Sequence, residues 1–181
     1  MRALLVVDVQ RDFCPGGALG VKDGNKIIPN INRLMQEFDL VVASRDWHPE
    51  ETVHFEKWPV HCVRGTEGAE FHPELQQRHI KQEFRKGTEN KDDGYSAFEA
   101  TNEDLAAYLK ARDVDELYIC GLTTEYCVKS TAIDAVRNGF KTFLFTDAIA
   151  PVNMHPGDAE KAHEEMQQEG VIFLTSKIVL R

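Results

Sequence analysis

Short apolar runs recur along the whole chain, and segments with a helical spacing of apolar residues separate most of them. The expected strands are residues 3–9, 39–44, 115–120, 140–146 and 171–174, with a weaker, more polar candidate at 79–84. The expected helices are residues 25–38, 101–112, 125–138 and 158–169. This alternation predicts an α/β fold, with a doubly wound, mostly parallel sheet of about six strands and helices on both faces.

Two kinds of signal place the ends of the expected helices. Gly139 and Gly170 follow the third and fourth helices, as is typical where a helix stops. The sequence Thr101-Asn102-Glu103-Asp104 resembles a capping box and predicts that the second helix begins there.

One segment, residues 45–78, interrupts the alternation of expected strands and helices. It contains three prolines, both tryptophans and four of the seven histidines. A loop of this length within a compact domain is usually functional. With 181 residues and neither internal repeats nor a linker, the chain is expected to form a single domain, residues 1–181. The segment at about 45–78 is expected to be a loop insertion that forms one wall of an active site, and its histidines make it a candidate metal-binding loop.

Charge and cysteine content narrow the classes of partner and location. The net charge of −9 argues against nucleic acid and anionic lipid as partners. No apolar run approaches the roughly 20 residues that a membrane-spanning helix needs. The N-terminal apolar stretch is too short for a signal peptide, so a cytoplasmic protein is expected. The four cysteines form no CxxC pair, which favours reduced thiols over a disulfide framework.

Reactive side chains follow the ends of several expected strands. Because ligands bind outside the carboxyl ends of the strands in an open α/β sheet, we expect these side chains to meet at one edge. They are Asp8, Gln10, Asp12, Asp46, His48, Lys86, Cys127 and Asp147.

Cys127 is the candidate nucleophile. The turn after the strand at 115–120 delivers it to the first turn of a helix, where backbone N–H groups stabilise a thiolate and can also hold an oxyanion. Asp8 would act as the general base and Lys86 as the cation that holds both groups. From spacing alone the same residues are also compatible with an inert buried thiol, a turn-capping aspartate and a surface lysine.

Asp46 and His48 form the core of a candidate metal site. Residues at i and i+2 of an extended segment point to the same side, and His61 would complete the face. Two histidines and one carboxylate suit zinc, iron or manganese. A histidine-rich polar loop would have the same spacing, and His54 could be a fourth ligand, an outer hydrogen-bond donor or a simple loop residue.

Taken together, six motifs resemble the isochorismatase-like cysteine hydrolase superfamily and, within it, the nicotinamidase family. They occur in order between residue 3 and about residue 150, which makes the set far more specific than any one motif. The matching stretches are 5–13 (LVVDVQRDF), 44–49 (SRDWHP), 58–63 (WPVHCV), 68–72 (GAEFH), 95–98 (YSAF) and 118–128 (YICGLTTEYCV).

The resemblance assigns a role to each candidate residue. It implies a catalytic triad of Asp8, Lys86 and Cys127, and an oxyanion hole made by the backbone amides of Thr123 and Cys127 beside a cis Leu122–Thr123 bond. It implies one divalent metal ion, zinc before iron or manganese, held by Asp46, His48 and His61, with His54 sometimes added. It also implies an aromatic pocket for the substrate ring, lined by Phe13, Trp58 and Tyr95.

The implied activity is hydrolysis of nicotinamide to nicotinate and ammonia, in NAD salvage, through a thioester on Cys127, and pyrazinamide should also be cleaved. The metal would orient the pyridine nitrogen, and a homo-oligomer is expected. The alternative within the superfamily is a metal-independent hydrolase acting on another small amide or a vinyl ether. The metal face of Asp46, His48 and His61 argues against that alternative. A non-catalytic sensor would have lost a triad member, and a redox role for Cys127 would need a resolving cysteine nearby.

Overall fold

Six parallel strands form one sheet, in the order β3-β2-β1-β4-β5-β6. The computed structural model describes residues 1–180. The strands are β1 (Arg2–Val7), β2 (Leu40–Asp46), β3 (Gln82–Lys86), β4 (Glu116–Leu122), β5 (Lys141–Ala150) and β6 (Ile172–Leu174). The predicted parallel α/β sheet is therefore confirmed.

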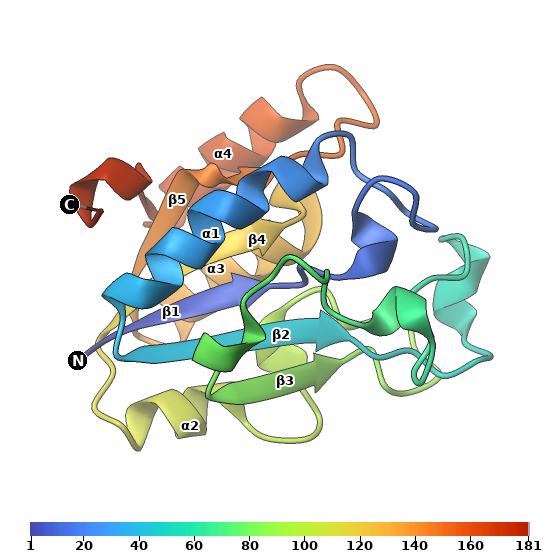
Figure 1. Cartoon of the computed structure of the whole chain (residues 1–181), viewed down its shortest axis with the longest axis horizontal. Helices are drawn as coiled ribbons and strands as arrows, with labels where there is room; N and C mark the ends of the chain where they lie inside the picture. Colours follow the sequence, from blue (N-terminus) through green and yellow to red (C-terminus); the bar gives the residue numbers. More distant parts are fainter. Residues whose placement is uncertain (181) are drawn as a thin grey trace.

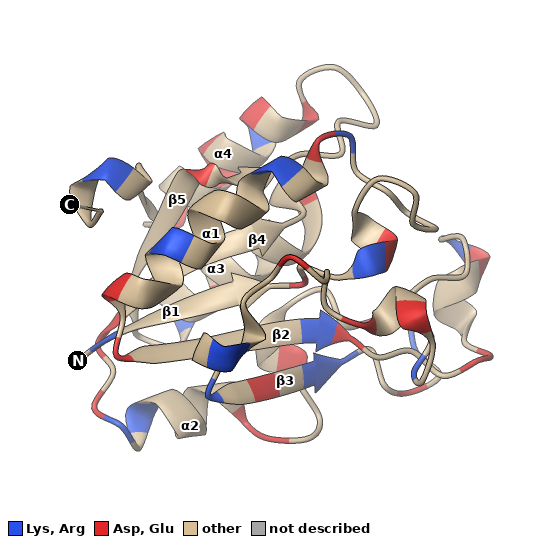
Figure 2. Ribbon diagram, viewed as in Figure 1, with Lys and Arg blue, Asp and Glu red and all other residues tan. Residues whose placement is uncertain are grey.

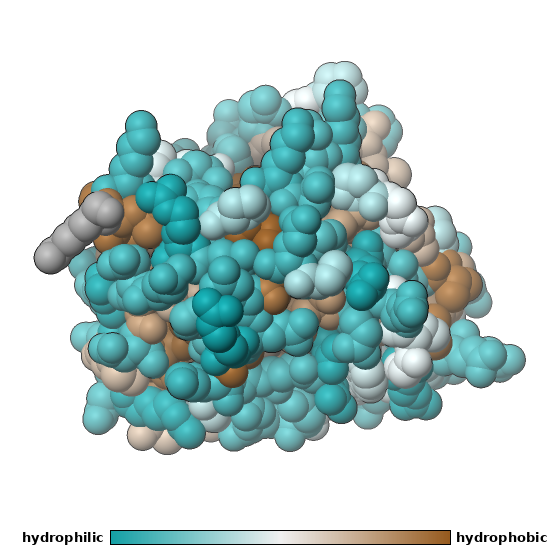
Figure 3. All heavy atoms as spheres, in the orientation of Figure 1, coloured by the Kyte–Doolittle hydropathy of each residue, from teal (hydrophilic) through white to brown (hydrophobic). Residues whose placement is uncertain are grey.

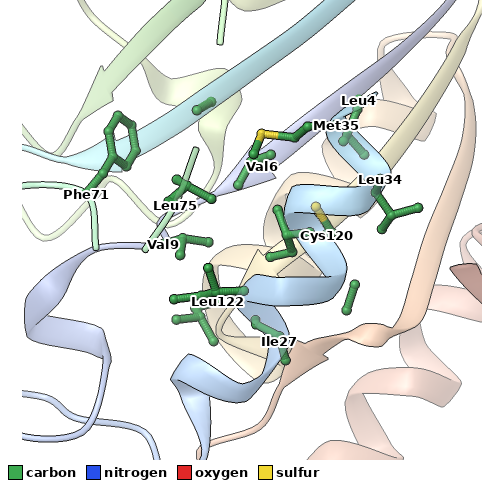
Figure 4. Close-up of a cluster of buried hydrophobic side chains, with 14 of the residues drawn as sticks. Leu4, Val6, Val9, Ile27, Leu34, Met35, Phe71, Leu75, Cys120 and Leu122 are labelled. Atoms are coloured by element: carbon green, nitrogen blue, oxygen red, sulfur yellow. The ribbon is translucent and has the colours of Figure 1, made fainter. Parts of the chain in front are cut away.

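Helices cover both faces of the sheet because the central strands are apolar on both sides. On β1, Leu4 and Val6 pack toward α1 (Ile28–Leu34), which lies in front of the sheet in Figure 1 and runs among the side chains of the same cluster in Figure 4. Leu5 and Val7 pack on the opposite side. That side holds α2 (Leu105–Lys110), α3 (Lys129–Arg137) and α4 (Asp158–Gln168). Near-continuous apolar runs are the expected signature of strands buried in this way.

Element boundaries differ from the prediction where turns interrupt the periodic pattern. The predicted helix 25–38 is α1 flanked by 3₁₀ turns at Gly24–Ile27 and Met35–Glu37. The weak strand at 79–84 starts three residues later, because a 3₁₀ turn occupies Gln77–His79. β5 continues to Ala150 instead of ending at 146.

The predicted capping box at Thr101 is wrong. The helix begins only at Leu105, and Asp104 is its N-cap, accepting a hydrogen bond of 2.9 Å from the Ala107 amide. The side chain of Asn102 bonds to β3 instead: its oxygen accepts from the Arg85 amide at 2.7 Å, and its nitrogen donates to the Glu83 carbonyl at 2.9 Å. These bonds pair backbone groups on the outer edge of β3. Because Asn102 is held there, residues 101–103 do not join the helix.

Long connections gather beyond the carboxyl ends of β1, β2 and β3. In Figure 1 the segment after β2, coloured from teal to green, extends past the arrowheads of these strands, on the side opposite both termini. Acidic and basic positions are scattered over the ribbon, and both kinds occur near the ends of β2 and β3 (Figure 2). The face shown in Figure 3 is mainly hydrophilic, with separate small hydrophobic patches. Within residues 1–180, every helix is too short or too polar to cross a membrane.

Candidate active site

Asp8, Lys86 and Cys127 come together at the carboxyl edge of the sheet. Lys86 Nζ lies 2.7 Å from Asp8 Oδ2 and 3.4 Å from Cys127 Sγ. The same ammonium donates to the Gly94 carbonyl and to Asp46 Oδ1, each at 2.5 Å. Asp8 and Lys86 are fully buried, and Cys127 is 8% exposed. An ammonium with four partners holds the thiol and the carboxylate side by side away from bulk water.

Asp8 is positioned by the end of β1. It adopts a left-handed conformation (φ 50°), so the chain turns there and its side chain stays at the sheet edge. Ser44, at the same level of β2, donates its hydroxyl to Asp8 Oδ1 at 2.8 Å, and the Asp8 amide donates to the Ser44 carbonyl. On the other side, Gly121 of β4 lies so close to β1 that a Cβ would stand 2.1 Å from the Val7 carbonyl oxygen. Glycine therefore permits the close approach that brings the Cys127 turn to Asp8.

Cys127 lies on a five-residue π-helical turn, Thr124–Val128, that leads into α3. The Leu122–Thr123 peptide bond before this turn is cis, as the resemblance implied. The Thr123 carbonyl accepts hydrogen bonds from the amides of Tyr126 and Val128, which fixes the turn. Thr123 and Cys127 both line the pocket beside the thiol, which is the placement that the predicted oxyanion hole requires.

Burial sets the protonation of Asp8 and Cys127. It raises the pKa of the Cys127 thiol well above its usual value, against the opposing effect of Lys86, so the sulfur carries its proton at rest. Burial also raises the pKa of Asp8, although Lys86 partly offsets this rise. Burial would lower the pKa of Lys86, but Asp46 and Asp8 raise it well above the usual value, so the ammonium persists. A carboxylate whose proton affinity is raised beside a protonated thiol is suited to accept that proton.

Four further side chains converge next to this group. One ring nitrogen from each of His48, His54 and His61 lies within 4.8 Å of the other two. Asp46 Oδ2 is 3.3 Å from His48 Nε2 and 3.6 Å from His61 Nε2, so the i, i+2 prediction for Asp46 and His48 describes their actual geometry. All four side chains are buried. The structure therefore brings His54 into the cluster, a position that the sequence left open.

Each of these histidines has its other ring nitrogen held by an oxygen acceptor. His48 Nδ1 lies 2.9 Å from the Gly87 carbonyl, His61 Nδ1 lies 2.7 Å from the Pro59 carbonyl, and His54 Nδ1 lies 3.0 Å from Asp92 Oδ1. With the proton on Nδ1, each Nε2 offers a lone pair to the cluster. His48 Nε2 is buried and has no hydrogen-bond partner among residues 1–180. A divalent cation would satisfy these lone pairs together with Asp46, so the donor set fits a metal ion.

An apolar pocket opens beside the cysteine and the histidines. The three aromatic residues predicted for the substrate ring, Phe13, Trp58 and Tyr95, all line it. Sequence reasoning missed four other lining residues, Leu19, Gly94, Tyr126 and Val152. Gly94 and Tyr126 had a signal, because they are next to Tyr95 and Cys127 in the sequence; Leu19 and Val152 come from irregular segments with no periodicity. Most of the lining is apolar or aromatic, and the Cys127 thiol, the Asp46 carboxylate and two histidines are its reactive polar groups.

Gln10 and Asp12 form hydrogen bonds to the backbone next to the histidine cluster. Gln10 donates to the Asp46 and Ala69 carbonyls and accepts from the Asp46 amide, all at 2.9 Å. Asp12 accepts from the amide of Cys62, the residue after His61, at 2.8 Å. Both side chains therefore fasten the backbone that carries the histidine cluster.

Asp147, predicted to stand at the same edge, does not belong to the site. β5 continues through this position, and the Asp147 carboxylate accepts hydrogen bonds from the amide and hydroxyl of Ser176 at 2.9 and 2.6 Å. The prediction failed because the strand extends four residues further than its apolar run indicated.

Comparisons with known proteins point to one family. A family model described as isochorismatase domain matches residues 2–178. A nicotinamidase from Acinetobacter baylyi is 40% identical, covering 98% of this chain and 94% of that protein. The structure of the pyrazinamidase of Pyrococcus horikoshii in complex with zinc is 45% identical, with a TM-score of 0.87 over 96% of this chain and 98% of that one. PnC1 from L. infantum in complex with nicotinate is 35% identical, with a TM-score of 0.91 over 98% of this chain and 93% of that one.

Proposed function

The chain belongs to the isochorismatase family, and from this membership and the geometry of its site we propose that it hydrolyses nicotinamide to nicotinate and ammonia. The observation that carries the proposal is the placement of two groups on one pocket. Cys127, held beside Asp8 and Lys86, lines the pocket at one point, and Asp46, His54 and His61 of the histidine cluster line it at another. A planar carboxamide with a ring nitrogen offers a partner to each.

The first half of the reaction forms a thioester. Asp8 accepts the Cys127 proton, and the sulfur attacks the carboxamide carbon while Lys86 balances the negative charge of the pair. The backbone amides of Thr123 and Cys127 hold the oxyanion of the tetrahedral species. As that species collapses, the C–N bond breaks and Asp8 returns its proton to the departing nitrogen, which leaves as ammonia.

The second half repeats the same proton transfer with water. Asp8, again a carboxylate, accepts a proton from the attacking water, the C–S bond breaks, and the proton returns to Cys127. One nicotinamide and one water have then given one nicotinic acid and one ammonia, and the acid ionises to nicotinate as its proton passes to ammonia or to solvent. The raised pKa values of Asp8 and Cys127 suit this cycle, because the proton moves between two buried groups of increased proton affinity.

Asp46, His48, His54 and His61 would hold a divalent ion, and zinc is the ion we propose because its donor preferences match them. When bound, this ion supplies a Lewis-acid contact for the ring nitrogen of the substrate. Phe13, Trp58 and Tyr95 would flank the ring, so that the carboxamide points to Cys127. Pyrazinamide shares the ring nitrogen and the carboxamide, and we expect it to be cleaved as well. The predicted homo-oligomer and cytoplasmic location stay predictions.

Ammonia release from nicotinamide, measured with and without prior chelation, tests the proposal. We expect turnover by the zinc-loaded protein, and a higher KM after chelation that added zinc reverses. Zinc-loaded protein that releases ammonia from neither nicotinamide nor pyrazinamide would contradict the assignment and return the substrate to an unidentified amide.

A further inference from the structure

Asp92 lies in the loop between β3 and α2 and faces the segment that carries His54. Its Oδ1 lies 3.0 Å from His54 Nδ1 and 2.8 Å from the Tyr95 hydroxyl, and its Oδ2 pairs with Lys57. The Lys57 ammonium stands at the second oxygen, so the group is a carboxylate that accepts hydrogen bonds from all three partners. One oxygen therefore touches a member of the histidine cluster and a member of the aromatic pocket at the same time.

The direction of each hydrogen bond in this network is determined. A carboxylate only accepts, so His54 must carry its proton on Nδ1 and present the Nε2 lone pair to the cluster. Tyr95 donates its hydroxyl proton to Asp92 and accepts from Trp58 Nε1 at 3.1 Å. The Asp92 charge thus sets the tautomer of one residue and the orientation of two aromatic side chains.

His54 differs from its two neighbours in this respect. His48 and His61 are oriented by backbone carbonyls, whereas the Nδ1 partner of His54 is a charged side chain from another loop. The two loops are fastened to each other nearby, where the Val53 amide donates to Asn90 Oδ1 at 2.8 Å. The position of Asp92 relative to His54 is therefore fixed by contacts that do not involve its own carboxylate.

We propose that Asp92 is a positioning residue that couples the metal site to the substrate pocket, orienting His54 for the ion and Tyr95 with Trp58 for the ring. The proposal rests on the proposed function only for the identity of the ring. Its metal half depends on the histidine cluster alone. Carboxylates that orient ligating histidines typically contribute about 10- to 100-fold to metal affinity.

The test compares Asp92→Asn with Glu89→Gln, a matched loss of one charge in the same loop. Glu89 is half-exposed and its side chain pairs with Lys91. The asparagine side chain introduced by Asp92→Asn keeps the size of the original but presents an N–H group that permits the other His54 tautomer. Zinc affinity, measured by competition with a chromophoric chelator, should fall about 10- to 100-fold in Asp92→Asn and stay within about twofold in Glu89→Gln. Equal affinities in the two variants would overturn the metal half of the proposal.

A double-mutant cycle separates an effect through His54 from a general loss of charge. In a His54→Ala background, Asp92→Asn should no longer change zinc affinity, because the side chain that it orients is gone. If Asp92→Asn still weakens zinc binding to the same extent in that background, the carboxylate does not act through His54 and the proposal is wrong.

The pocket half has its own readout. Tyr95→Phe removes the hydroxyl link to Trp58 but leaves Asp92 beside His54, so it should raise KM for nicotinamide several-fold and leave zinc affinity unchanged. Asp92→Asn should change both quantities, with a smaller effect on kcat at saturating zinc and substrate. A normal KM in both variants would refute the link to the pocket. A parent protein that cleaves no nicotinamide, yet loses zinc affinity on Asp92→Asn, would instead refute the substrate and keep the positioning role of Asp92.

Discussion

The two halves of the site are built by different means. Asp8, Lys86 and Cys127 stand at or just after the ends of strands, and the hydrogen-bonded sheet places them. His54 and His61 lie in the irregular segment after β2, which lacks strand pairing apart from isolated bridges. Side chains such as Gln10, Asp12 and Asp92 fix that segment by bonding to its backbone and its histidines. The sheet thus holds the proposed catalytic groups, and a network of polar side chains holds the proposed metal ligands.

This difference predicts that the two halves can be damaged separately. Variants of the sheet-borne half should lose chemistry and keep metal. Variants of the loop-borne half should lose metal and substrate affinity first. Each prediction below tests that separation, beginning with the largest effect.

Cys127→Ala should abolish turnover and leave zinc bound. Without the sulfur no thioester forms, and loss of a nucleophile typically lowers kcat on the order of 10⁴-fold or more. Ammonia release and zinc content of the purified variant measure the two effects. Cys120→Ala is the control, because that thiol is buried in β4 within the core cluster and borders no part of the pocket. Measurable ammonia release by Cys127→Ala would remove Cys127 from its role.

His48→Ala should show the opposite pattern, losing metal and raising KM. Partners that only orient a ligand contribute 10- to 100-fold to metal affinity, so removal of a ligand should cost at least about 100-fold. Chelator competition measures the affinity, and His163→Ala on α4, whose ring packs on Phe173 of the edge strand β6, is the control. Retention of parental zinc affinity by His48→Ala would mean that the histidine cluster is not the metal site.

The same division explains how much the sequence could predict. Apolar runs locate buried strands, and parallel strands end at a common edge, so the meeting of Asp8 and Lys86 follows from periodicity. The position of Cys127 follows from the turn after β4. Asp147 shows the limit of this reasoning, because a strand that outlasts its apolar run carries the next polar residue away from the site.

Only part of the loop-borne half could be predicted from the sequence. The i, i+2 spacing of Asp46 and His48 could be read because β2 and the residues after it are extended. The inclusion of His54 and the role of Asp92 could not be read. They depend on contacts between segments 38 residues apart in the sequence, and no periodic pattern encodes such contacts. Helix caps pose the same problem on a small scale, since Thr101 and Asp104 are both acceptable caps and a distant strand edge decides between them.

Gln10→Ala should lower both the stability of the protein and its metal affinity. Gln10 lies where the sheet-borne and loop-borne halves meet, because it bonds to Asp46 at the end of β2 and to Ala69 in the segment that follows. The change leaves the Asp46 amide and two buried carbonyls without their partners. Unsatisfied buried groups cost about 1–3 kcal/mol each, and partial relaxation should leave a loss of roughly 2–4 kcal/mol in the free energy of unfolding. Urea denaturation measures this loss. Gln36→Ala, an exposed glutamine bonded only to the Asn32 carbonyl, should change stability by less than about 1 kcal/mol. Equal stability of the two variants would show that the Gln10 bonds contribute little.

Asp104→Ala should have the smallest effect and should leave both halves of the site intact. Loss of an N-cap acceptor typically costs about 1 kcal/mol, and α2 packs on the sheet through Leu105 and Leu109, which border no part of the pocket. Thr101→Ala is the matched comparison, because its hydroxyl pairs with Thr88 at the surface instead of capping the helix. Thermal denaturation should therefore give a larger decrease in Tm for Asp104→Ala than for Thr101→Ala, with unchanged kcat, KM and zinc affinity in both. If Thr101→Ala were the more destabilising of the two, the cap would lie where the sequence alone placed it, and the assignment of the helix start to Leu105 would be wrong.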